Sequence, residues 1–230
     1  MVNVPRHPDH QVIVTMAEHL QRTKSNSLIT MIRDEDVHSG HIFNSGVASD
    51  TSKNNSNIYD TLIVFHDEYA SQPMYNNYKR FVSNGGTIIF VDANVFIAEV
   101  DYNKSNHTIT LVKGHTWEFD GKSARKSVDK RWFNENKDWV GSNFLVSGLR
   151  DKIYFLNNPF NYTHFEENYV NNPRNKILLD YDAVVPKNSV YAGFHVASYE
   201  LSYRKGKVIM TGLYGQTLIS NKLFLKMLDS

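Results

Sequence analysis

The sequence predicts an α/β fold with a mostly parallel central sheet, helices on both faces and a β-rich insertion. The main observation is a strand–helix–strand pattern in which residues 59–65 and 87–91 are apolar runs flanking a segment with helical spacing at 73–83. Strands that are apolar throughout are buried on both faces of a sheet. A connection of this length joins parallel strands through a right-handed crossover.

The segments before and inside this unit are assigned by the same rules. Residues 11–22 have the spacing of an amphipathic helix, and the short apolar run at 27–32 is typical of a buried strand. Residues 38–57 are rich in Ser, Asn, Gly and Asp, which predicts a long surface loop. Gly85 and Gly86 end the helix at 73–83, as glycine does at a helix C-terminus.

The C-terminal part is regular again after a segment with scattered apolar residues. We expect a strand up to residue 203, a tight basic turn at 204–207, an apolar strand at 208–212 and a helix at 220–228. Residues 101–175 are interpreted as an insertion on one domain spanning 1–230. Within the insertion, a half-exposed strand at 107–111 is expected to pair with residues 115–119.

Composition narrows the classes of function. The 25 Lys and Arg residues balance 24 Asp and Glu, and the mixed charges argue against a nucleic-acid partner. The chain has no cysteine, which excludes a thiolate nucleophile, disulfides and Cys-ligated zinc. No apolar run reaches the roughly 18–20 residues of a membrane span, so we expect none. Both an extracellular location, after removal of a signal peptide, and a cytoplasmic one stay open.

Three segments resemble the class I glutamine amidotransferase-like fold, within it the trehalose-utilisation (ThuA-like) branch. They are the strand at 59–65, the Gly85-Gly86 turn with its following strand, and the strand at 206–212 before the final helix. The resemblance covers about half the chain and implies a flavodoxin-like, amidotransferase-like architecture. The nucleophilic cysteine of that family falls on Asp92 here, and aspartate cannot perform its thioester chemistry.

The cysteine enzymes of the same family also use a His-x-Glu pair near the C-terminus. His195 and Glu200 echo this pair, but their spacing differs from it. His195 has either a catalytic role or the role of a half-buried strand residue.

Polar side chains follow both apolar strands of the central unit. They are His66, Asp67 and Glu68 after the first strand, and Asp92 and Asn94 after the second. Ligands of open parallel sheets bind beyond the carboxyl ends of the strands, so these residues form a candidate pocket. Carboxylates beside an imidazole can bind a hard cation or act as general acid and base. The alternative is that the acidic residues cap the helices that follow.

Two further groups are weaker candidates. His38 and His41 lie in a glycine-containing segment and are possible metal ligands, although a metal site needs three or more ligands and the spacing marks no third. The aromatic residues of the insertion form either a sugar-stacking platform or a small satellite core. They are Trp117, Trp132, Phe133 and Trp139.

The sequence supports two classes of function and leaves open whether the protein is an enzyme. The first is a non-catalytic amidotransferase-like domain that binds a ligand or assembles with another protein, because no complete nucleophile–base–orienter set can be identified. The second is a hydrolase that uses Asp67, Glu68 and Asp92, with or without a metal ion. We expect no cofactor, and the partner is an unidentified small molecule or protein.

Overall fold

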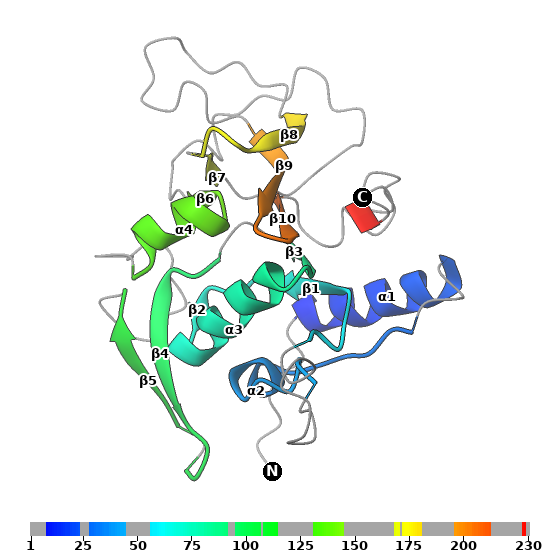
Figure 1. Ribbon diagram of the computed structural model, residues 1–230. Helices are drawn as coiled ribbons and strands as arrows, with labels where there is room; N and C mark the ends of the chain where they lie inside the picture. Colours follow the sequence, from blue (N-terminus) through cyan, green and yellow to red (C-terminus); the bar gives the residue numbers. More distant parts are fainter. Residues whose placement is uncertain are drawn as a thin grey trace.

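The computed structural model describes residues 8–23, 28–44, 56–91, 95–106, 108–114, 131–144, 168–170, 172–180, 196–212 and 227–228. Its largest sheet has five strands in the order β1 (Thr61–Phe65), β3 (Thr87–Val91), β10 (Gly206–Thr211), β9 (Val196–Tyr203) and β8 (Lys176–Asp180) (Figure 1). The chain therefore has the α/β architecture that its sequence predicts.

The central strand–helix–strand unit is confirmed. Strand β1 pairs parallel to β3, with Thr61 opposite Thr87 and Phe65 opposite Val91. On its other edge, β3 pairs parallel to β10. Both strands of the unit end within two residues of their predicted limits.

The expectation of a mostly parallel sheet is corrected, because the sheet is mixed. Strand β9 pairs antiparallel with both β10 and β8. The reason is the tight turn between Tyr203 and Gly206, in which Arg204 has a φ of 52°. So short a connection can join antiparallel strands only, whereas a parallel pair needs a long crossover.

Helix α3 (Gln72–Ser83) packs against β3 and β10. It begins at Ser71, whose Oγ accepts a hydrogen bond of 3.3 Å from the Met74 amide. It ends at Asn84, and Gly85 follows with a φ of 108°, a value that favours glycine. Its buried face consists of Met74, Tyr75, Tyr78, Phe81 and Val82. The helix predicted at 73–83 is therefore confirmed.

The remaining elements surround this unit. The helices are α1 (Pro8–Thr23), α2 (Asp34–His38) and α4 (Phe133–Trp139). A three-stranded sheet contains β2 (Tyr69–Ala70), β4 (Ala98–Asn103) and β5 (Thr108–Lys113), and a two-stranded sheet contains β6 (Ser142–Phe144) and β7 (Asn168–Val170). Helix α1 confirms the prediction for 11–22, whereas most of the predicted helix at 220–228 lies outside the described residues. None of the described helices is long and apolar enough to cross a bilayer.

The strand predicted at 27–32 is wrong, whereas the strand predicted at 107–111 is present. Residues 28–32 form no strand, and Leu28 and Met31 are 94% and 63% exposed. These residues lead directly into α2 and pair with no strand among the described residues, so their apolar side chains alone do not produce a sheet. The strand predicted at 107–111 exists as β5, but it pairs with β4, which precedes it in the sequence. Its expected partner at 115–119 lies outside the described residues.

The two described tryptophans belong to the main core. The ring of Trp132 stacks on that of Tyr75 in α3, with centroids 4.4 Å apart and planes 6° from parallel. Trp139 is fully buried in the same cluster as Phe90 of β3. The rings of Trp132 and Trp139 therefore form neither a satellite core nor an open sugar-stacking platform, whereas Trp117 lies outside the described residues. The organisation as one domain with an insertion at 101–175 stays a prediction.

We expect Tyr199→Phe to lower the free energy of unfolding by about 1–3 kcal/mol, the cost of leaving a buried polar group unsatisfied. The fully buried Tyr199 hydroxyl lies 2.7 Å from the Val140 carbonyl oxygen and 2.6 Å from the Ser142 Oγ. The Tyr199 O–H can donate to only one of these two oxygens. It therefore donates to the Val140 carbonyl, and the Ser142 hydroxyl donates to the Tyr199 hydroxyl oxygen. Urea unfolding measures the loss. Tyr59→Phe is the matched control, because the half-buried Tyr59 makes no hydrogen bond through its hydroxyl to a described residue, and an equal loss in both variants would contradict the prediction.

Candidate functional site

The segment 66–68 leaves β1 beside the chain that leaves β3. The amide of His66 donates to the carbonyl of Val91 over 3.2 Å. The carbonyl of Asp67 accepts from Phe96 at 2.8 Å, and that of Glu68 accepts from Ile97 at 2.9 Å. The carboxyl ends of the two strands thus form one edge, as the candidate pocket requires. Because residues 92–94 lie outside the described residues, the inclusion of Asp92 and Asn94 stays a prediction.

His66 and Glu68 form a pair at this edge. The Nε2 of His66 lies 3.7 Å from the Oε2 of Glu68, and the side chains are 40% and 5% exposed. His66 also has a φ of 51°, a left-handed conformation that is uncommon for a residue with a side chain and is often found at functional sites. A partly exposed imidazole beside a buried carboxylate, at a separation longer than a hydrogen bond, can act as a general base whose charged form the carboxylate stabilises.

Asp67 lies in a different environment, formed by α3 and α2. Its carboxylate hydrogen-bonds with the hydroxyl of Tyr78 and is repelled by Asp34. Burial, and then the charge of Asp34, raise the pKa of Asp67 well above its ordinary value. Its Oδ2 is buried and makes no hydrogen bond to a described residue. Asp67 therefore lies in a separate environment from its two neighbours in sequence, which form the His66–Glu68 pair.

Tyr78 and Asp34 were not among the predicted site residues. Burial raises the pKa of Tyr78, and the neighbouring charge of Asp67 raises it further. The Asp34 side chain keeps exposed surface, yet partial desolvation of its carboxyl raises the pKa of that group. In the sequence, Tyr78 is one of several apolar-face residues of a helix and Asp34 is one of three acids that follow Arg33. No local signal links either of them to Asp67.

The helix-capping alternative is wrong for Asp67 and Glu68. The next helix, α3, is capped by Ser71 instead. Both carboxylates are buried, with 7% and 4% of the residue surface exposed. Their burial needs a reason other than capping, since an acidic residue is almost never fully buried without a partner.

We expect Asp67→Asn to raise the free energy of unfolding, and the gain to grow as the pH rises above about 4. The ordinary pKa of 3.8 describes the unfolded chain, and the folded pKa is higher. As the pH rises from 3.8 towards the higher folded pKa, the Asp67 carboxyl loses its proton in the unfolded chain before it does so in the folded protein. The wild-type protein therefore loses stability over this pH range. Asparagine has the same shape and does not ionise. Urea unfolding at a series of pH values measures the difference, and the exposed Asp101→Asn is the control. A pH profile unchanged by Asp67→Asn would contradict the prediction.

The weaker candidates are placed apart from one another. His38 Nδ1 lies 2.7 Å from Ser71 Oγ, and His41 Nδ1 lies 3.5 Å from the Asp36 carboxylate. Within the described part of the chain, no three His, Asp or Glu residues form a group that could hold a metal ion. Glu200 lies on β9, 3.9 Å from the Lys176 ammonium. His195 lies outside the described residues, so its role stays a prediction.

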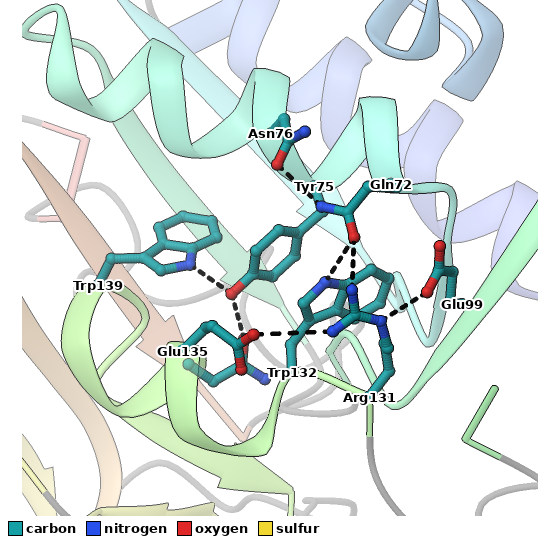
Figure 2. A network of polar contacts seen from close by, with 9 residues as sticks. Gln72, Tyr75, Asn76, Glu99, Arg131, Trp132, Glu135 and Trp139 are labelled. Carbon is teal, nitrogen blue, oxygen red and sulfur yellow. Dashed lines mark hydrogen bonds and ion pairs between the residues drawn. The ribbon is translucent and has the colours of Figure 1, made fainter.

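A second polar network joins three elements next to the core (Figure 2). Arg131 Nε donates to Glu99 of β4 over 2.6 Å, and its Nη2 donates to Gln72 of α3 over 2.9 Å. Its Nη1 lies 3.6 Å from Glu135 of α4. The backbone amide of Arg131 also donates to the carbonyl of Ile97, which lies beside the Glu68 backbone. The network therefore fixes the chain that flanks the His66–Glu68 edge.

Comparisons with known proteins identify one family. The model of the family described as N,N-dimethylformamidase beta subunit-like, C-terminal, matches residues 30–188, more than half of the chain. No curated protein matches the sequence.

Two solved structures that match are the GH42 beta-galactosidase Gan42B and its catalytic mutant, the latter from G. stearothermophilus. They are 14% and 15% identical to this chain, with TM-scores of 0.48 and 0.46. The matches cover 100% of this chain and 26% of each enzyme, so this chain spans about a quarter of their length. Similarity at this level carries no argument about activity.

The resemblance to the trehalose-utilisation branch of the amidotransferase-like fold is wrong. The family model is a different one, and none of the comparisons points to that branch. The segments that suggested it are an apolar strand, a helix, a Gly-Gly turn and a second apolar strand. Any buried parallel strand–helix–strand unit needs these features, so they do not distinguish one family from another.

Proposed function

Because this chain belongs to the N,N-dimethylformamidase beta subunit-like C-terminal family, we propose that it hydrolyses the C–N bond of a small amide at the His66–Glu68 edge. The family name supplies the substrate class, a small N-substituted formamide. The single observation that supports the site is the accessible imidazole of His66, 3.7 Å from a buried carboxylate at the end of a central strand.

The proposed reaction uses His66 as general base. The imidazole removes a proton from a water molecule while the water oxygen attacks the amide carbonyl. Glu68 holds the ring in place and stabilises the imidazolium that forms. The C–N bond then breaks, the imidazolium returns its proton to the leaving amine, and a carboxylic acid is released. Water is consumed, and no oxidant or reductant is needed.

The sheet supports this placement of the site. We propose that helices cover both of its faces, which leaves the strand ends as the accessible places. Ile88 faces the cluster under α3, and its neighbour Ile89, which faces the other way, is equally buried. Met16 and Leu20 of α1 supply buried side chains outside that cluster. His66, 40% exposed, lies at such a strand end and is open to a substrate.

The test is hydrolysis of N,N-dimethylformamide by the purified 230-residue chain. Release of dimethylamine and formate above the buffer rate is expected, and His66→Asn should remove it. Asparagine is chosen because it tolerates the left-handed backbone of residue 66 and cannot act as the base. A folded wild-type chain that releases no amine would overturn the proposal. It would favour the alternative, a non-catalytic domain for ligand binding or protein assembly.

A further inference from the structure

We propose that a pocket beside Arg80, separate from the His66–Glu68 edge, binds a small monocarboxylate with an apolar body. The pocket has a volume of about 430 Å³ and is lined by residues 39–41, 43 and 44, together with Ile58 and Arg80. This size is within the range of small-molecule sites. Arg80 is nine residues after Ser71, the cap of α3, which places it about 14 Å along the helix from the end near Glu68.

The first observation is the arrangement of the Arg80 guanidinium. Its carbon lies 3.5 Å from the centroid of the Phe43 ring, so the group is stacked on the wall of the pocket. It makes no hydrogen bond or ion pair with any residue that the structure describes. A stacked guanidinium is pre-organised, and its planar N–H groups match the two oxygens of a carboxylate.

The walls of the pocket set the chemical class of the ligand. Ile58 is 48% exposed and offers apolar surface to the body of a ligand, and Phe43 forms the buried wall beneath the guanidinium. Two basic residues line the pocket. His41 lies 3.5 Å from the Asp36 carboxylate, whereas Arg80 has no acidic partner among the described residues. A doubly charged anion would be repelled by Asp36. A monocarboxylate with an apolar body fits both the charge and the walls.

The pocket is built on fixed backbone. The amide of Asn44 donates to the Ser56 carbonyl over 2.9 Å, and that of Ile58 donates to the Ile42 carbonyl over 3.0 Å. The side chain of Asn57 donates to the Phe81 carbonyl of α3 over 2.9 Å. These bonds hold the turn after α2 and the segment before β1 against the helix that carries Arg80. The ligand-binding groups are therefore in place before a ligand arrives.

The experiment is a titration of the full chain with sodium benzoate, followed by NMR chemical shifts of the residues that line the pocket. Saturable binding is expected, and Arg80→Gln should weaken it at least tenfold. Arg80→Lys keeps the charge without the planar fork and should bind with an intermediate affinity. Arg22→Gln is the matched control, since Arg22 is an exposed arginine on α1, and it should bind like the wild type.

Two further probes separate the possible ligands. Benzyl alcohol has the apolar body without the charge and should not compete with benzoate. Inorganic phosphate has charge without the apolar body and should bind more weakly than benzoate. The proposal is overturned if benzoate does not saturate, if Arg80→Gln binds it as the wild type does, or if phosphate binds more tightly.

Discussion

Replacing Trp139 with alanine should lower the free energy of unfolding by about 3–5 kcal/mol, the cost of removing a large aromatic ring from a core. The Trp139 side chain is fully buried and contacts the rings of Phe90, Phe96 and Tyr75. Its Nε1 donates to the Tyr75 hydroxyl over 2.8 Å, so the substitution also removes a partner of a buried polar group. Urea unfolding followed by far-ultraviolet circular dichroism measures the loss.

Two variants make this result specific. Trp139→Phe keeps most of the apolar surface and removes only the N–H group, so its loss should be clearly smaller. Asn134→Ala changes an exposed position of the same helix, α4, and should alter stability by less than about 0.5 kcal/mol. If Trp139→Ala cost no more than Asn134→Ala, the assignment of α4 to the main core would be wrong.

The second large effect concerns activity and depends on the proposed hydrolysis. We expect His66→Asn to lower kcat/KM for N,N-dimethylformamide by roughly 10²–10⁴-fold, the range over which a positioned general base contributes. Glu68→Gln keeps the shape and removes the charge, so the imidazolium loses its stabilising partner 3.7 Å away. Its kcat/KM should also fall, with KM changing less than kcat, because the stabilised charge develops during the reaction.

The control is His19→Ala, which removes a histidine of α1 that does not belong to the His66–Glu68 pair. Its activity should equal that of the wild type, and circular dichroism should show all three variants folded. A folded His66→Asn variant with wild-type kcat/KM would remove His66 from the mechanism, even if the wild-type chain hydrolyses the amide.

The parts of the fold that could be predicted are those with local signals. The strands at 61–65 and 87–91 are recognised because they are mostly apolar, and α3 between them is followed by Gly85 and Gly86. The parallel pairing of β10 with β3 joins segments that are more than one hundred residues apart in sequence, which no local pattern specifies. The run at 27–32 shows the opposite error, because its composition favours a strand but residues 28–32 pair with no strand in the described part of the chain.

Only part of the candidate site could be predicted, because a local rule selects some of its residues and others depend on distant parts of the chain. The rule that ligands bind at strand ends selects His66 and Glu68 from the sequence alone. The separation of Asp67 from them could not be predicted, because it depends on Tyr78 and Asp34 in two other helices. Family membership was missed because the segments with the clearest patterns are architectural and recur in unrelated parallel sheets.

The position of β10 has a consequence for how the chain folds. The strand that pairs with β3 is formed by residues 206–211, more than one hundred residues after β3 itself. During synthesis, β1, α3 and β3 leave the ribosome with one edge of β3 still unpaired, and the backbone N–H and C=O groups of that edge have no strand partner until β10 is made. Contacts between such distant segments slow folding, and unpaired strand edges favour aggregation in the meantime. We therefore expect the nascent chain to depend on chaperones until β10 has been synthesised.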